Sequence, residues 1–123
     1  MRHVAMEFPG EPESVREARA FVGDTLEAWG LPSAVEVAVL LTSEVTTNAV
    51  RHAGGPFEVT VEERTPEVLV KVRDGSARPA TLRVVPVDAE NGRGLPMVRI
   101  LADRWGSTTL AAGKLVWFAV PAR

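Results

Sequence analysis

The sequence predicts a two-layer α+β sandwich, because two kinds of apolar spacing alternate along the chain. Stretches with an apolar residue at every second position predict strands, and stretches with apolar residues three and four positions apart predict helices. Their order is strand, helix, helix, two strands, a long connection with a short helix, and two strands. With 123 residues and 46% hydrophobic content, the chain can build one sizeable core, so we expect a single domain over residues 1–123.

The chain begins with an edge strand and an amphipathic helix. Residues 3–8 place large apolar side chains at every second position, which is typical of a strand with one buried face. Residues 14–29 carry apolar side chains at helical spacing, with charged residues between them. Gly30 follows directly and is expected to end this helix.

A second, more apolar helix is expected to begin near Ser33. Ser33 followed by Glu36 has the form of a capping box, in which each side chain accepts a hydrogen bond from a free N–H group of the first turn. The helix is apolar around much of its girth and should be largely buried. The Gly-Gly-Pro sequence at residues 54–56 is expected to stop it.

Two pairs of antiparallel strands are expected after this helix. Residues 57–63 and 67–74 alternate valines with charged or polar residues across a short turn. Residues 105–110 and 114–120 are expected to form the closing hairpin.

The connection between the two strand pairs is unusually long. Residues 75–94 are rich in proline and glycine, and residues 95–102 read as a short helix. Connections of this length are usually functional or disordered.

Composition excludes several classes of function. The formal net charge of −2, with both signs mixed along the chain, gives no basic patch for nucleic acid. The absence of cysteine excludes disulfides, thiolate metal sites and thiol catalysis. No signal-peptide core and no membrane-length apolar run is present, so a soluble cytoplasmic protein without a membrane partner is expected.

The main candidate for chemistry is a polar stripe on the second helix. Glu44, Asn48 and His52 recur every four residues, which places them on one side of a helix that is otherwise apolar. An amide oxygen is a hard ligand suited to Mg²⁺, and a carboxylate can orient or deprotonate a hydroxyl group. The stripe is therefore suited to a metal-bound polyphosphate, although a helix whose polar side simply faces solvent would show the same pattern.

This stripe and two later motifs carry a family resemblance. The segment over residues 43–53, the Asp74-Gly75 pair and the Gly-Arg-Gly sequence at residues 92–94 together resemble the histidine-kinase-like ATPases, also called GHKL or Bergerat-fold proteins. Within that family the chain most resembles the bacterial anti-sigma-factor serine/threonine kinases, over residues 33–121. The resemblance implies a Bergerat-type sandwich, with a mixed, mostly antiparallel sheet covered on one face by helices.

The resemblance also implies roles for individual residues. Glu44 matches the family's catalytic base, and Asn48 matches its Mg²⁺ ligand in the nucleotide site. Asp74 matches the aspartate that accepts a hydrogen bond from the adenine amino group, beside Gly75, which permits close approach of the base. Without the rest of the pattern, an Asp-Gly pair would be read as a turn.

Further candidate residues would bind the phosphates. They are Arg51 and His52 in the second helix, and Gly92, Arg93, Gly94 and Leu95 before the short helix. Both sets have a plain structural interpretation as well: cations favour a helix C-terminus, and glycines with a solvated arginine make a flexible hinge. The second glycine that many relatives carry after the Asp-Gly pair is missing here.

The function implied by the resemblance is that of an ATP-binding regulator. Its cofactors would be ATP and Mg²⁺, and its partners a sigma factor and a small antagonist protein that it phosphorylates on serine or threonine. A homodimer is compatible with this reading. Two alternatives stay open: a nucleotide-gated binding module that transfers no phosphate, and an interaction domain that no longer binds ATP.

Overall fold

The computed structural model describes residues 1–75 and 104–123. In chain order the elements are β1 (His3–Phe8), α1 (Pro12–Ala28), a short 3₁₀ helix (η1, Pro32–Ala34), α2 (Val35–His52), β2 (Phe57–Arg64), β3 (Glu67–Asp74), β4 (Arg104–Leu110) and β5 (Gly113–Pro121). All four expected strands after α2 are present, with ends within one residue of the predicted ones. The rest of the long connection, residues 76–94, and the helix expected over residues 95–102 lie outside the described residues.

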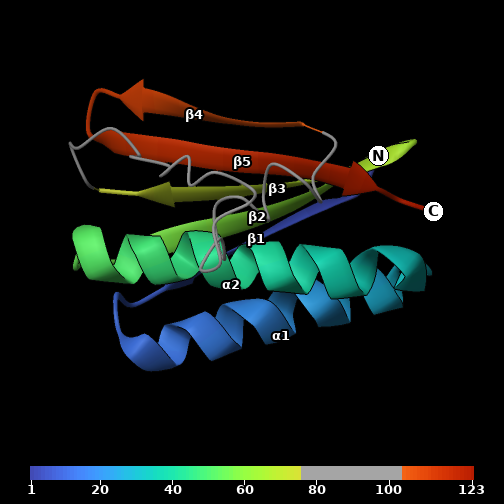
Figure 1. Ribbon diagram of the computed structural model, residues 1–123, viewed down its shortest axis with the longest axis horizontal. Coiled ribbons are helices and arrows are strands. Elements are labelled where there is room, and N and C mark those ends of the chain that lie inside the picture. The colour runs from blue at the N-terminus through green and yellow to red at the C-terminus, as the bar shows by residue number, and fades with distance from the viewer. Residues whose placement is uncertain (76–103) are drawn as a thin grey trace, which may run out of the picture.

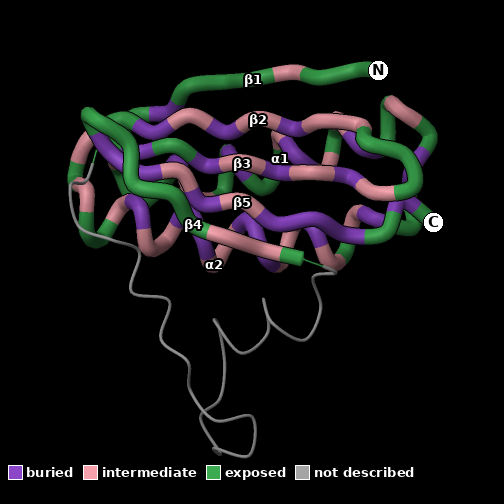
Figure 2. Tube along the Cα trace, turned by 90° about the horizontal axis from the view of Figure 1, so that it is seen from above, coloured by how far each residue is buried: buried purple, intermediate pink, exposed green. Residues whose placement is uncertain are grey.

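The described strands form one sheet in the order β1-β2-β3-β5-β4, and each of its pairings is antiparallel. Both long helices lie on the same face of this sheet (Figure 1), α1 against β2 and α2 against β3 and β5. Figure 2 looks onto the other face, where no described helix covers the strands. The predicted α+β sandwich, with a sheet covered on one face, is confirmed, but the sheet of the described strands is antiparallel throughout and not mixed.

Strand alternation sorts side chains between the two faces. In β3, Val68, Val70 and Val72 are buried beneath the helices, while Lys71 and Arg73 point to the open face. The same alternation runs through β2 and β5. The core that results is built from these valines, from three phenylalanines on β1, β2 and β5, and from the apolar stripes of both helices.

The helix α1 packs closely against one side of α2. At Gly23, an added Cβ atom would lie 3.3 Å from a methyl carbon of Val39 and 3.9 Å from one of Val35. The Val35 side of α2 is therefore the side that α1 covers. Neither helix has the length and hydropathy that a membrane crossing requires.

The end of α1 follows the sequence prediction. Gly30 has a φ of +74°, in the left-handed region that glycine adopts without steric cost. The N–H group of Leu31 donates to the carbonyl oxygen of Leu26 at 2.9 Å, which satisfies one of the last free carbonyls of the helix. The chain can then turn back towards α2.

The capping box predicted at Ser33 is wrong. Ser33 lies inside η1, and the residue at the N-cap of α2 is Ala34, which makes no side-chain cap hydrogen bond. Main-chain hydrogen bonds cap the helix instead. The N–H group of Ala34 donates to the carbonyl oxygen of Leu31 at 3.1 Å, and that of Val35 donates to the carbonyl oxygen of Pro32. A 3₁₀ turn leading into a helix satisfies its first N–H groups without a serine side chain.

Candidate functional site

The polar candidates on α2 border its buried stripe. The buried residues of α2 recur at helical spacing and include Ala38, Leu41, Thr42, Val45, Thr46 and Ala49. Glu44 and Asn48 lie beside this stripe and are half-buried. This partial cover is compatible with a nucleotide site and with a polar helix side that faces solvent.

Glu44 and Asn48 lie on the flank of α2 that faces away from α1. Nine residues separate Val35 from Glu44, and at 3.6 residues per turn this is about two and a half turns, which places them on opposite sides of the helix. Asn48 follows Glu44 by one turn, about 6 Å along the axis. A carboxylate and an amide therefore stand in line on a flank that α1 leaves uncovered.

Arg51 and His52 occupy the last turn of α2 and are exposed. Cations at this position interact favourably with the partial negative charge of the helix C-terminus. Their location is thus compatible with both interpretations drawn from the sequence.

Asp74 ends β3 as a buried carboxylate, as the sequence suggested, and the residue is 5% exposed. It points to the same face as Val72, towards the helices, because the two are two residues apart on the strand. Lys114 of β5 lies opposite it in the strand register and is equally buried. The Lys114 Nζ atom lies 3.7 Å from Asp74 Oδ2, so the two charges form a buried ion pair.

The backbone of Gly113 lies against the end of β3. A Cβ atom added there would lie 2.0 Å from the carbonyl oxygen of Asp74, and the φ of Gly113 is +150°. Only glycine allows this approach. The turn before β5 therefore fixes where Asp74 and Lys114 stand.

The end of β3 and the end of α2 belong to the same end of the domain. The chain leaves α2 at His52 and enters β2 five residues later at Phe57, which pairs with Asp74. Figure 1 shows the C-terminal end of α2 and the tip of β3 on the same side of the molecule. The fold thus brings the C-terminal end of α2, the last turns of which follow Asn48, to the end of the sheet that holds Asp74.

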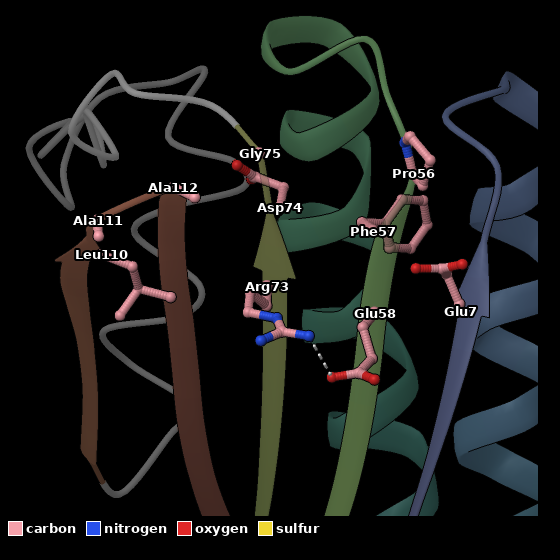
Figure 3. Close-up of a pocket in the computed structure, with 10 residues that line it drawn as sticks. All are labelled: Glu7, Pro56, Phe57, Glu58, Arg73, Asp74, Gly75, Leu110, Ala111 and Ala112. Carbon is pink, nitrogen blue, oxygen red and sulfur yellow. Dashed lines mark ion pairs between the residues drawn. The ribbon is translucent and has the colours of Figure 1, made fainter.

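A cavity of about 410 Å³ lies at this end of the sheet. Its lining, drawn in Figure 3, comprises Glu7, Pro56, Phe57, Glu58, Arg73, Asp74, Gly75, Leu110, Ala111 and Ala112. Glu58 and Arg73 project from the open face of the sheet and form an ion pair at 3.4 Å. The cavity therefore opens at the strand ends and on the open face of the sheet, where Asp74 and the exposed Gly75 line it. Glu44 and Asn48 are not among its lining residues.

The donor set on α2 fits a magnesium ion shared with a polyphosphate. Mg²⁺ usually keeps several waters and takes one or two protein ligands together with phosphate oxygens. Asn48 offers a partly exposed amide oxygen, and Glu44 offers a carboxylate one turn away. Gly92, Arg93, Gly94 and Leu95, the candidates expected near the phosphates, lie outside the described residues.

Lys114 is the residue of this region to which sequence reasoning gave no role. The strand pattern could have predicted that Lys114 is buried, because it stands in the same alternating row as Val116, Phe118 and Val120. A lysine at an inward position of an apolar strand needs a buried partner. Asp74 is that partner.

Comparison with known proteins places these observations in a family. Residues 8–120 match the family model described as "Histidine kinase-like ATPase domain". No curated protein sequence matches the chain. The matched stretch contains every candidate residue from Glu44 to Leu95.

A solved structure shares the fold. It is the crystal structure of the RsbU and RsbW domains of Rv1364c from Mycobacterium tuberculosis, with a TM-score of 0.71 and 20% sequence identity. The match covers 100% of this chain and 34% of that one, so the chain spans about a third of its neighbour's length. With the family match covering nearly the whole sequence, we conclude that this chain belongs to the histidine kinase-like ATPase domain family.

Proposed function

We propose that this domain binds Mg²⁺-ATP and acts as a serine/threonine kinase of the anti-sigma-factor type. The observation that carries the proposal is the pair Glu44 and Asn48, one turn apart on a partly covered flank of α2, the helix whose C-terminal end lies at the same end of the domain as the buried Asp74. Membership of the histidine kinase-like ATPase family supports the nucleotide. A fold shared with a structure that contains an RsbW domain is consistent with the regulatory role.

Glu44 and Asn48 would divide the chemistry between them. Asn48 would bind the metal through its amide oxygen, and the metal when bound would shield the phosphate charges. Glu44 would accept the proton of a serine or threonine hydroxyl whose oxygen bonds to the γ-phosphorus, as ADP leaves. Arg51 and His52, at the exposed end of the same helix, would add positive charge near the phosphates.

The adenine base would be recognised at the end of β3. Asp74 would accept a hydrogen bond from the adenine amino group, and Gly75, which carries no side chain, would let the base approach. Gly92, Arg93, Gly94 and Leu95 would bind the phosphates through main-chain N–H groups and the arginine side chain.

The biological setting follows from the same reading. The chain would act as one domain over residues 1–123 in the cytoplasm, alone or as a homodimer. It would bind a sigma factor and phosphorylate a small antagonist protein, without contacting nucleic acid or a membrane itself.

Two substitutions on α2 test the site. Asn48→Ala is expected to abolish binding of Mg²⁺-ATP, whereas Glu44→Gln is expected to preserve binding and lose phosphate transfer. Thr47→Ala, on the same helix and similarly half-buried, is the matched control and should bind ATP as the wild type does. Affinity is measured by calorimetry, and transfer by incubating each variant with γ-labelled ATP and a small-protein fraction from the source cells.

The results separate the proposal from its alternatives. A small protein labelled on serine or threonine by the wild type but not by Glu44→Gln supports the kinase. Tight ATP binding with no labelled protein favours a nucleotide-gated binding module instead. Unchanged ATP affinity in Asn48→Ala means that the assignment of the site to α2 is wrong.

A further inference from the structure

We propose that Lys114 positions the carboxylate of Asp74 and thereby sets the preference of the site for a nucleobase that presents an amino group. This inference rests on the proposed function, in which Asp74 reads the base. It adds a specificity role for a lysine to which the family comparison gives none. Four observations on β3 and β5 support it.

The first observation is the burial of the lysine. Lys114 is 5% exposed and lies in the inward row of β5 with Val116 and Phe118. Lysine is almost never fully buried unless it is paired, because its ammonium group loses water without compensation. Its retention in an apolar row calls for a reason beyond packing.

The second observation is the geometry of the pair. The register places Lys114 directly opposite Asp74, so both side chains leave their strands on the same face. The Nζ atom lies 3.7 Å from Oδ2, and the two side chains are 6% and 2% exposed. The ammonium therefore faces the carboxylate in a setting that water hardly screens.

The third observation is the rigidity of the frame. Gly113 brings the turn before β5 so close to Asp74 that no side chain fits between them. The position of Lys114 relative to Asp74 is thus set by main-chain contact on one side and by strand pairing on the other. A flexible surface lysine would not have this constraint.

The fourth observation concerns the other charged groups around this end of the sheet. Glu58 and Arg73 are on the open face and pair with each other, and Glu7 lines the same cavity from β1. Arg51 and His52 are exposed in the last turn of α2. On the helix side of the sheet, the described strand register puts the charged residue Lys114 beside Asp74.

These observations have a consequence for hydrogen bonding. A charged carboxylate only accepts hydrogen bonds, whereas a protonated one also donates. By holding that carboxylate in place across the strand pair, Lys114 makes Asp74 complementary to an exocyclic amino group and not to a carbonyl oxygen at the same position.

The test compares two nucleotides that differ only in the base. ATP carries an amino group at position 6, and inosine triphosphate carries a carbonyl oxygen there. Dissociation constants for both, with Mg²⁺, are measured for the wild type, Lys114→Met, Lys114→Gln and Lys114→Arg. Lys71→Met is the matched control, because Lys71 is also a strand lysine in an ion pair, with Glu62, but lies on the open face.

The wild type is expected to prefer ATP by about 10- to 100-fold, the range of a hydrogen bond to a charged group. The preference is expected to fall below about threefold in Lys114→Met and Lys114→Gln, and to persist in Lys114→Arg and Lys71→Met. A lysine with a purely structural role would lower stability without changing the ratio of the two affinities. Sucrose, which favours the folded state, is added to every sample so that the neutral variants stay folded.

Two results would overturn the inference. One is an unchanged preference for ATP in either folded neutral variant. The other is a loss of preference in a folded Lys114→Arg, since the positive charge is kept there. If the wild type binds neither nucleotide, the proposed function itself fails, and this outcome is distinct from both.

Discussion

The two faces of the sheet differ in where their charged residues lie: ion pairs are near solvent on the open face and buried on the face under the helices. On the open face, charged side chains pair with one another near solvent, as Glu62 does with Lys71 and Arg64. The face under the helices is apolar along β3 and β5 until the last row, where Asp74 and Lys114 are both buried. An exposed ion pair contributes little to the free energy of folding. A buried pair loses the hydration of both charges when it forms, and removing one partner destabilises the fold strongly because the other charge stays buried. The buried pair therefore marks the end of the sheet where function is to be sought.

The same contrast distinguishes the two flanks of α2. The Val35 flank is packed against α1, at the close approach of Gly23. The opposite flank carries Glu44 and Asn48, which are only half-buried. Helix packing thus covers the apolar side and leaves the polar side near the end of the domain that holds Asp74.

The largest expected effect is on the buried pair. Asp74→Ala removes the carboxylate that faces Lys114 and is expected to lower the free energy of unfolding by about 3–5 kcal/mol. Glu62→Ala, which breaks pairs on the open face, is the control and should cost about 1 kcal/mol or less. Urea unfolding measures both. Equal costs for the two substitutions would contradict the contrast between the faces.

The next effect concerns the turn that holds this pair. Gly113→Ala places a methyl group against the carbonyl of Asp74 and is expected to destabilise the fold by about 2–3 kcal/mol through backbone strain. Gly55→Ala, where an added Cβ atom meets nothing within 4 Å, should change stability by less than about 0.5 kcal/mol. The two melting temperatures give the comparison. A Gly113→Ala variant as stable as Gly55→Ala would mean that the turn does not constrain β3.

The smallest effect is the acid sensitivity of the open face. Partial burial raises the pKa of Glu62, but hydrogen bonds and positive charges from Lys71 and Arg64 outweigh it, and the pKa lies below its ordinary value of 4.5. A carboxyl group of this kind adds stability above its ordinary pKa, and this contribution is lost as the pH falls through the lowered value. Glu62→Gln is therefore expected to be less stable than the wild type at pH 7, by under about 1 kcal/mol, with the gap closing below about pH 4.5. A gap that persists in acid would assign the effect to packing.

Much of the fold could be predicted from the sequence because its patterns are local. Strand alternation and helical spacing gave each described element to within a few residues, and Gly30 marked the end of α1. The capping box at Ser33 failed because the sequence does not show whether a side chain or a 3₁₀ turn will satisfy the first N–H groups. Main-chain hydrogen bonds of the 3₁₀ turn satisfy those N–H groups, and no particular residue type predicts such bonds from the sequence.

The candidate site was predictable only in part. Glu44 and Asn48 were singled out by their spacing on one helix and by the family resemblance, and Asp74 by that resemblance at the end of a predicted strand. The ion pair with Lys114 depends on the pairing of β3 with β5, which are separated by a long connection, and so it needed the register of the sheet. The cavity beside Asp74 likewise gathers residues from four strands and from three connecting segments.

The central claim is that this domain binds Mg²⁺-ATP, and the melting temperature with and without the nucleotide tests it most directly. At a concentration 100 times the dissociation constant, ATP should add about 2.7 kcal/mol to the free energy of unfolding and raise the melting temperature by several degrees. Mg²⁺-GTP at the same concentration should give a clearly smaller shift. No shift at millimolar ATP would contradict the claim and leave an interaction domain that keeps the fold of its family without the nucleotide.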